Sequence, residues 1–276
     1  MTPPPPPDAP SRAVRSADGT PIAVFTSGVG PALVLVHGAA ADHTTFRVLG
    51  PLLSPRFTIH TIDRRGRGAS GDASPYAIER EFEDLAAVAT ALAAETGDPI
   101  DVFGHSYGGR CALGAALLTS DIGRVISYEG APTPPGERYG DAALPRELAA
   151  LAAAGHDETL LETFMTRVVG MSAEDLDRYR ADPVWPRRVA AARTIAREVA
   201  VESGDGAGLD RLGAVEQPVL QVLGGESRRE FRVATAALDD RLADGTIVVI
   251  PGAGHAAHHT HPDAVLEAMT AFLTPQ

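Results

Sequence analysis

Cysteine is almost absent from this chain of 276 residues, since Cys111 is the only one. A lone cysteine excludes an internal disulfide and fits a reducing compartment, so we expect a cytoplasmic protein. No apolar run approaches the ~20 residues that a membrane-spanning helix needs. The first ten residues also lack the charged and apolar parts of a signal peptide. These absences predict a chain with no membrane partner.

Basic side chains are scarce as well. Lysine and arginine number 24 against 36 aspartates and glutamates, which gives a formal net charge of −12. This excess of negative charge argues against a nucleic-acid partner, because a phosphate backbone would be repelled. Hydrophobic residues make up 44% of the chain, which is ample for a core. The length fits one large domain or two modest ones, and it leaves the oligomeric state open.

Residues 1–11 contain five consecutive prolines, Pro3 to Pro7. Proline has no N–H to donate to a strand or helix, so this segment is predicted to be a disordered, proline-rich leader. Folded structure is predicted to begin near Arg12.

Strand and helix patterns alternate after the leader. Strand patterns occupy 12–17, 22–26, 31–36, 57–62, 124–128 and a run beginning at 100, and helical patterns occupy 44–53, 75–95 and 111–118. Several of these strands are continuous apolar runs, which are typical of strands buried on both faces. The alternation predicts an α/β fold with a mostly parallel central sheet flanked by helices.

The alternation stops between residues 131 and 213, where only helical patterns occur. Strand patterns resume at 218–223 and 246–250, and a last helix is predicted over 262–273. We therefore predict an α/β core formed by residues 12–130 and 214–276, with residues 131–213 inserted as a helical cap.

Ser106 lies between a predicted strand and a predicted helix, in the stretch Gly104-His105-Ser106-Tyr107-Gly108. Glycines two residues to either side let neighbouring chain pass close to a sharp turn. Such a turn holds the hydroxyl at the end of the strand, where the free N–H groups of the helix favour an oxyanion. The context predicts a nucleophilic serine, whereas Cys111 on the following helix is better interpreted as a packing residue.

With three further motifs, this stretch resembles the α/β-hydrolase superfamily. The motifs are His37-Gly38 after a strand, the loop Asp63–Ser70, and Gly252-Ala253-Gly254-His255. The resemblance runs from about residue 20 to the end of the chain. It implies an esterase-like or lactonase-like member with a serine nucleophile and a helical cap, and neither a cofactor nor a metal.

The resemblance also implies roles for single residues. His255 would accept the proton of Ser106, whereas His258, His259 and His261 are expected to have surface or capping roles. The oxyanion would be held by the backbone N–H groups of Tyr107 and Ala39, with Ala40 as the alternative to Ala39. His37 is expected to fix the loop that it begins.

Two carboxylates compete for the role of the triad acid. Much of the family places an aspartate after the strand predicted at 219–223, but this chain has Glu226 in that loop. A subset of the family places the acid one strand earlier, where Glu129 directly follows a predicted strand. Both satisfy the order nucleophile, acid, histidine; we favour Glu129 and keep Glu226 as the alternative.

Two further features have alternative interpretations. The Asp63–Ser70 loop combines three arginines with two glycines, so it could bind an anion, but the resemblance favours a structural turn. Trp185, between Pro183 and Pro186, fits either a pocket wall or an anchor for a cap helix.

The sequence therefore predicts a hydrolase of small-molecule carboxylic esters or lactones that works through an acyl-enzyme. A carbon–carbon bond hydrolase or a perhydrolase would use the same triad. A ligand-binding receptor or regulator on this fold is the non-enzymatic alternative. Dehalogenase and epoxide hydrolase chemistry is excluded, because a serine ether could not be hydrolysed.

Overall fold

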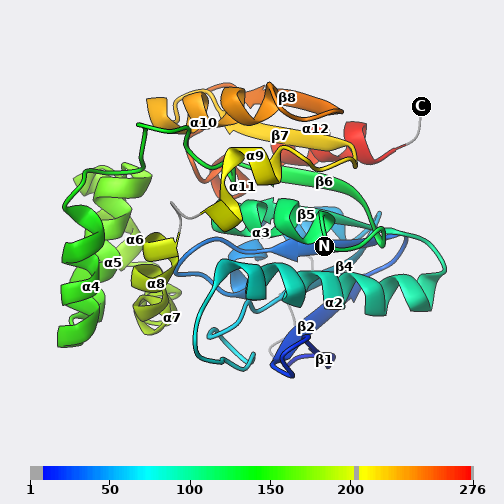
Figure 1. Ribbon diagram of the computed structural model, residues 1–276, viewed down its shortest axis with the longest axis horizontal. Coiled ribbons are helices and arrows are strands. Elements are labelled where there is room, and N and C mark those ends of the chain that lie inside the picture. The colour runs from blue at the N-terminus through cyan, green and yellow to red at the C-terminus, as the bar shows by residue number, and fades with distance from the viewer. Residues whose placement is uncertain (1–8, 202–204, 275–276) are drawn as a thin grey trace.

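The computed structural model describes residues 9–201 and 205–274, and Figure 1 shows a central sheet with helices on both faces. Residues 1–8 of the predicted leader lie outside the described residues. The strands are β1 Arg12–Arg15, β2 Pro21–Gly28, β3 Ala32–Val36, β4 Thr58–Ile62, β5 Ile100–His105, β6 Ile122–Tyr128, β7 Val219–Gly224 and β8 Gly245–Ile250.

The eight strands form one sheet in the order β1-β2-β4-β3-β5-β6-β7-β8. Strands β3 to β8 are parallel to one another, and β1 and β2 add an antiparallel edge. The predicted fold class is therefore confirmed. The carboxyl ends of the parallel strands meet at one edge, where the loops that follow β3, β5, β6, β7 and β8 come together.

The helices outside residues 131–201 are α1 Leu49–Leu53, α2 Ile78–Thr96, α3 Tyr107–Ala116, α9 Leu209–Leu212, α10 Arg229–Asp239, α11 Ala257–Thr260 and α12 Pro262–Leu273, with 3-10 turns at His43–Phe46 and Asp205–Ala207. The helix predicted at 44–53 is divided into the first of these turns and α1. Gly50 and Pro51 in that segment are weak helix formers, and the Asp42 side chain already accepts from the Thr44 N–H at the first turn.

The two faces of the sheet bury separate apolar clusters, because alternate side chains of a strand point to opposite faces. Val34 and Val36 pack in the cluster that includes Leu85 of α2 and Leu113 of α3. Leu33 and Leu35 belong to the other cluster, with residues of α1 and α12. Burial on both faces explains the continuous apolar runs of the sequence.

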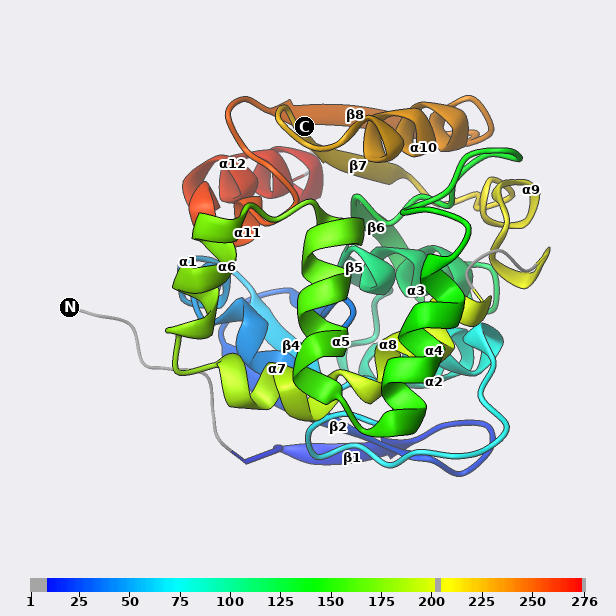
Figure 2. The same ribbon diagram turned by 90° about the vertical axis from the view of Figure 1, so that its left-hand side faces the viewer.

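Between β6 and α9 the described residues contain helices joined by loops and no strand. The helices are α4 Leu144–Ala154, α5 Asp157–Phe164, a π-helical turn Met165–Val169, α6 Ala173–Arg180, α7 Trp185–Ala191 and α8 Arg193–Val201. Figure 2 shows these helices in front of the sheet, over the end where β5 leads into α3. We refer to residues 131–213 as the helical segment. It has its own apolar cluster, which includes Leu148, Leu160 and Trp185.

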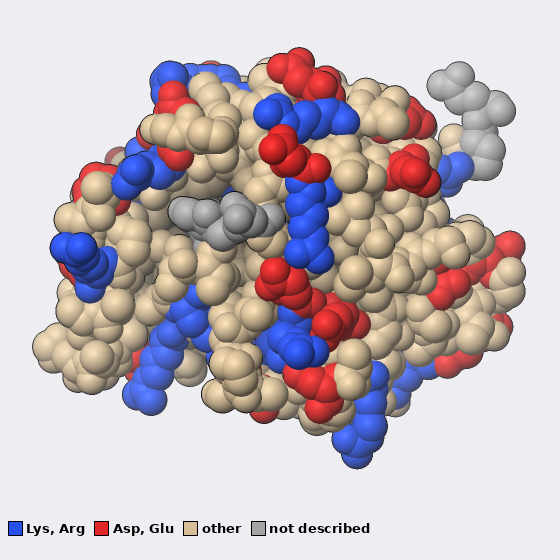
Figure 3. Space-filling model, viewed as in Figure 1, with Lys and Arg blue, Asp and Glu red and all other residues tan. Residues whose placement is uncertain are grey.

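Charged side chains of both signs are interspersed on the face drawn in Figure 3, and no large basic patch gathers there. Among the described residues, no helix is long and apolar enough to cross a membrane.

Candidate active site

Ser106 occupies a strained turn between β5 and α3. Its backbone has φ 54° and ψ −123°, a conformation that residues other than glycine rarely adopt. The two flanking glycines are required by close contacts: a Cβ on Gly104 would lie 2.3 Å from the Gly108 carbonyl oxygen, and a Cβ on Gly108 would lie 2.4 Å from that of Val36. The turn therefore depends on the glycine spacing seen in the sequence.

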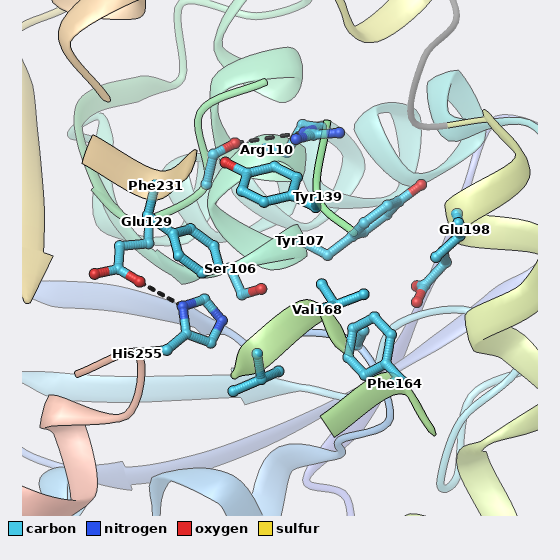
Figure 4. A pocket seen from close by; sticks show the side chains of 14 residues that line it. Ser106, Tyr107, Arg110, Glu129, Tyr139, Phe164, Val168, Glu198, Phe231 and His255 are labelled. Carbon is cyan, nitrogen blue, oxygen red and sulfur yellow. Dashed lines mark hydrogen bonds and ion pairs between the residues drawn. The ribbon is translucent and has the colours of Figure 1, made fainter. Parts of the chain in front are cut away.

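His255 and Glu129 meet beside Ser106 (Figure 4). His255 Nδ1 lies 2.5 Å from Glu129 Oε2, and the Glu129 side chain is fully buried. Glu129 directly follows β6 and also has a positive φ of 49°. Glu129 therefore holds the imidazole at Nδ1, and Nε2 remains available for a second hydrogen-bond partner.

The other oxygen of Glu129 is held from the loop after β7. Its Oε1 accepts from the Gly224 N–H at 2.8 Å and from the Ser227 hydroxyl at 2.5 Å. Three hydrogen-bonding groups therefore surround this carboxylate, as a buried charge requires.

Glu226, the alternative acid, is exposed in the same loop. Its backbone N–H donates to the Ala253 carbonyl, while the next two arginines pair elsewhere, Arg228 with Glu230 and Arg229 with Glu137. Of the two candidate acids, Glu129 is therefore the one that contacts His255.

The loop that carries His255 is braced by residues adjacent to Ser106 and Glu129 in the sequence. His105 Nε2 lies 2.8 Å from the His255 carbonyl oxygen. The Tyr128 hydroxyl donates to the Gly254 carbonyl and accepts from the Ala257 N–H. The Phe231 ring stacks on the His255 imidazole, with 4.4 Å between ring centroids. The loops that carry Ser106, Glu129 and His255 therefore hold one another in position.

The expected oxyanion donors lie on the same cavity. Tyr107 begins α3 and Ala39 follows the His37-Gly38 pair, and both line the cavity with Ser106. Ala40 is buried with φ 49° and packs into the apolar cluster of the helical segment. His37 accepts from the Arg64 N–H through Nε2, and its Nδ1 lies 2.9 Å from the Gly38 carbonyl oxygen. These contacts agree with a loop-fixing histidine.

The expectation for His258 was wrong. Instead of lying at the surface, it is 2% exposed on α11 and packs against His105, with 4.2 Å between the ring centroids. Neither of its ring nitrogens has a hydrogen-bond partner among the described residues. The sequence missed this because α11, a four-residue helix, turns the side chain inward before α12 begins. His259 and His261 are half-buried.

The cavity over Ser106 is lined from both the sheet edge and the helical segment. Its volume is about 30 Å³, counted as room for the centres of water molecules. The walls are Ala39, Ser106, Tyr107, Arg110, Glu129, Gly130, Tyr139, Phe164, Val168, Val169, Glu198, Val199, Phe231 and His255. Trp185 is not among them: it packs inside the helical segment, where its indole N–H donates to Glu158. The anchoring interpretation of Trp185 is therefore the one that fits.

The three arginines of the Asp63–Ser70 loop are buried and paired with carboxylates. Arg65 binds Asp84 through two nitrogens, each at 2.7 Å. Arg64 binds Glu81 at 2.7 and 3.0 Å. Both Arg64 and Arg67 also contact Glu198 of α8. Burial would lower the pKa of Arg64, but Glu198 and Glu81 hold it well above its ordinary value. The loop is a structural turn that joins the core to the helical segment.

Arg64 also reaches the residue after the nucleophile. Its guanidinium lies 4.6 Å from the centroid of the Tyr107 ring, and the Tyr107 hydroxyl lies 2.9 Å from that of Tyr76. Tyr76 in turn donates to Glu81. The Tyr107 side chain is thereby fixed away from Ser106, while its backbone remains at the turn.

Sequence reasoning assigned no role to Glu198, Phe164, Tyr139 or Phe231, although all four line the cavity. They lie on elements far apart along the chain, so no local motif unites them. Among the described residues, no group of three or more histidine, cysteine, aspartate or glutamate side chains is arranged to hold a metal ion.

A family model described as the alpha/beta hydrolase family matches residues 33–268. The chain is 30% identical over 257 residues to a 2-(acetamidomethylene)succinate hydrolase from Mesorhizobium japonicum, covering 91% of this chain and 90% of that one. It is 30% identical over 258 residues to a pimeloyl-[acyl-carrier protein] methyl ester esterase from Xanthomonas campestris pv. campestris, covering 89% and 96%.

Among solved structures, the chain is similar to an alpha/beta hydrolase from Sphaerobacter thermophilus. The TM-score is 0.81 at 33% identity, and the match covers 95% of this chain and 100% of that one. Both the motifs around Ser106 and the match across most of the sequence lead to the same conclusion: the chain belongs to the alpha/beta hydrolase family.

Proposed function

We propose that the protein hydrolyses carboxylic esters or lactones through an acyl-enzyme on Ser106, with His255 as the base and Glu129 as the acid. The observation that carries this proposal is the 2.5 Å contact between His255 Nδ1 and Glu129 Oε2, next to a serine on a strained turn. This is the arrangement that makes a serine hydroxyl nucleophilic.

The reaction follows from these positions. His255 Nε2 accepts the hydroxyl proton as Ser106 Oγ attacks the carbonyl carbon, and Glu129 stabilises the imidazolium that forms. The N–H groups of Tyr107 and Ala39 hold the oxyanion. The imidazolium then returns the proton to the leaving alcohol. Water, deprotonated by His255, cleaves the acyl-enzyme by the same route.

We assign residues 131–213 as a cap over a core of residues 12–130 and 214–276. Phe164 and Val168 of this segment form an apolar wall of the cavity across from Ser106, and Val199 also lines the cavity. Such a wall selects the size and polarity of the acyl or alcohol part. The methyl ester esterase among the similar proteins is consistent with ester chemistry.

Turnover of a p-nitrophenyl ester and labelling by an organophosphonate probe test the proposal. We expect both in the parent, and a loss of ~10³-fold or more in turnover in Ser106→Ala at unchanged stability. Ser120→Ala, which removes an exposed hydroxyl, is the matched control. Activity within tenfold of the parent in Ser106→Ala would remove Ser106 from the mechanism.

The same assays separate the other functions that this triad allows. A carbon–carbon bond hydrolase would be labelled at Ser106 yet would prefer substrates cleaved beside a ketone. A receptor would bind a ligand without turnover.

A further inference from the structure

Glu198 places a buried carboxylate in the wall of the cavity, on the helical segment. Its side chain is 1% exposed, and it comes from α8, far in sequence from Ser106, His255 and Glu129. In Figure 4 Ser106 lies between His255 on one side and Glu198 on the other. The carboxylate therefore faces the space that a substrate bound to Ser106 would enter.

The two oxygens of Glu198 have different surroundings. Oε1 accepts from Nη2 of both Arg64 and Arg67. Oε2 is equally buried but has no hydrogen-bond partner among the described residues. An ionised oxygen without a partner is costly inside a protein, so a site of this kind calls for a donor. The two arginines fix the carboxylate and leave one oxygen available.

The charges around Glu198 indicate what kind of donor fits. Arg64 and Arg67 carry two positive charges, and Glu81 and Glu198 carry two negative charges, all in side chains at most 1% exposed. Within this cluster the four charges balance, and Arg110, which also lines the cavity, donates to the Gly130 and Ala131 carbonyls. An ammonium group would add an uncompensated charge to this buried cluster, and an anion would meet the free carboxylate oxygen at close range. A neutral donor adds no charge to the cluster and is not repelled by the carboxylate oxygen.

The rest of the wall limits where such a donor sits on the ligand. Val199 is the neighbour of Glu198 on α8, and Phe164 and Val168 complete an apolar surface beside it. The part of a ligand that lies along this surface is therefore apolar, apart from the group that meets Glu198. Specificity of this form is strong, because a ligand that lacks the group leaves a buried acceptor unpaired.

We propose that Glu198 is a specificity-determining residue whose Oε2 accepts a hydrogen bond from a neutral donor, a hydroxyl or an amide N–H, on the substrate. This inference rests on the ester or lactone hydrolysis proposed above, and it narrows the substrate class to apolar esters or lactones that carry one such donor.

Matched substrate pairs test it. Methyl 3-hydroxybutyrate is compared with methyl butyrate, so that the donor lies in the acyl part. Similarly, 2-hydroxyethyl butyrate is compared with propyl butyrate, so that the donor lies in the alcohol part. Methyl 3-aminobutyrate tests a cationic substituent, and monomethyl succinate tests an anionic one. Acid release gives kcat/KM for each. We expect the hydroxylated member of at least one pair to be favoured about 10-fold or more, and both charged esters to be poorer than it.

The variant Glu198→Gln keeps the shape of the side chain and turns the amide N–H₂ toward the cavity when its oxygen stays on the arginines. We expect the preference for the hydroxyl to fall in this variant, because the hydroxyl can then only accept from a neutral N–H₂ group and no longer donates to a carboxylate. Glu162→Gln, which changes a carboxylate of α5 that pairs with Arg180, is the control and should leave the preference intact. Glu198→Asp serves if the glutamine variant does not fold; its shortened carboxylate should also reduce the preference.

Equal kcat/KM values within both pairs in the parent would overturn the proposal, as would a preference that is undiminished in Glu198→Gln. A preference for the ammonium ester over the hydroxyl ester would overturn the choice of a neutral donor. If the parent cleaves no ester, the proposed hydrolysis fails on its own. Binding of 4-hydroxy-2-pentanone against 2-pentanone, two ketones that differ only in the hydroxyl, is then measured by calorimetry: tighter binding of the hydroxylated ketone supports the role of Glu198 and equal binding contradicts it.

Discussion

Ser227 donates a hydrogen bond of 2.5 Å from its hydroxyl to Glu129, across two neighbouring strands of the sheet. The loop that carries Ser227 is the one in which much of the family places the acid itself. In this chain it supplies two donors instead, the Ser227 hydroxyl and the Gly224 N–H, and both bind Oε1 of Glu129. The second oxygen is thereby aimed at His255.

Removing this hydroxyl should weaken catalysis without removing the triad. We expect Ser227→Ala to lower kcat/KM by about 10-fold, because the Glu129 carboxylate loses one charge-assisted hydrogen bond and some of its orientation. The measurement is kcat/KM for one ester on folded protein, with Ser120→Ala as the control. Unchanged kinetics would mean that the Gly224 N–H alone suffices to orient the acid.

The two candidate acids can be ranked directly. Glu129→Gln should reduce turnover by ~10²- to 10⁴-fold with little change in stability, because a neutral amide cannot stabilise the imidazolium of His255. Glu226→Gln changes an exposed side chain and should cost far less. The reverse ranking, measured with one ester on folded variants, would move the acid to Glu226.

Substrate range should depend on the cavity wall rather than on the interior of the helical segment. We expect Phe164→Ala to change the ratio of kcat/KM between short-chain and long-chain esters, since Phe164 lines the cavity. Trp185→Phe removes the hydrogen bond to Glu158 away from the cavity, so it should lower stability by about 1 kcal/mol and leave that ratio unchanged.

If Trp185→Phe changed the ratio of kcat/KM between short-chain and long-chain esters as much as Phe164→Ala does, substrate range would not depend on the cavity wall alone. Leu151 and Trp185 are both large apolar residues of the helical segment, but neither lies on the cavity wall.

Acid should destabilise the fold through its buried histidines. Burial, and then the neighbouring imidazoles of His105 and His259, lowers the pKa of His258 well below 6.5. The unfolded chain binds this proton near pH 6.5 and the folded chain does not. The stabilisation is therefore complete above pH 6.5 and is lost as the pH falls below it, by up to ~1.4 kcal/mol per pH unit for one group.

Urea unfolding at pH 7.5 and pH 5.0 measures this loss. We expect His258→Phe to reduce the difference between the two pH values, while His156→Gln, which changes an exposed histidine, should not. An undiminished difference in His258→Phe would assign the acid sensitivity to other groups, such as His60 and His259, whose pKa values burial lowers to about 4.

The order of the elements and the turn at Ser106 could be predicted because their signals are local. Apolar runs identify the buried strands, and the glycines at 104 and 108 are demanded by contacts within one turn. Glu129 could be proposed as the acid because it directly follows a strand. Whether Glu129 or Glu226 contacts His255 depended on how the β7 loop folds, which no local pattern encodes.

Two features could not be predicted from the sequence because they depend on long-range contacts. Glu198 meets Arg64 across 134 residues of chain. His258 is buried because α11 packs against the strand end that carries His105. Both depend on tertiary packing, so neither spacing nor composition identifies them.

The helical segment leaves the core after β6 and returns to it at β7, and these two strands are direct neighbours in the sheet, paired from Val125 with Val219 to Tyr128 with Val222. The segment belongs to the crossover connection that two parallel neighbours require, so its length and content do not shift the register of the strands. A segment transplanted from another member of the family would therefore enter and leave at two neighbouring strands, but it would also have to supply a carboxylate to Arg64 and Arg67 in the place of Glu198.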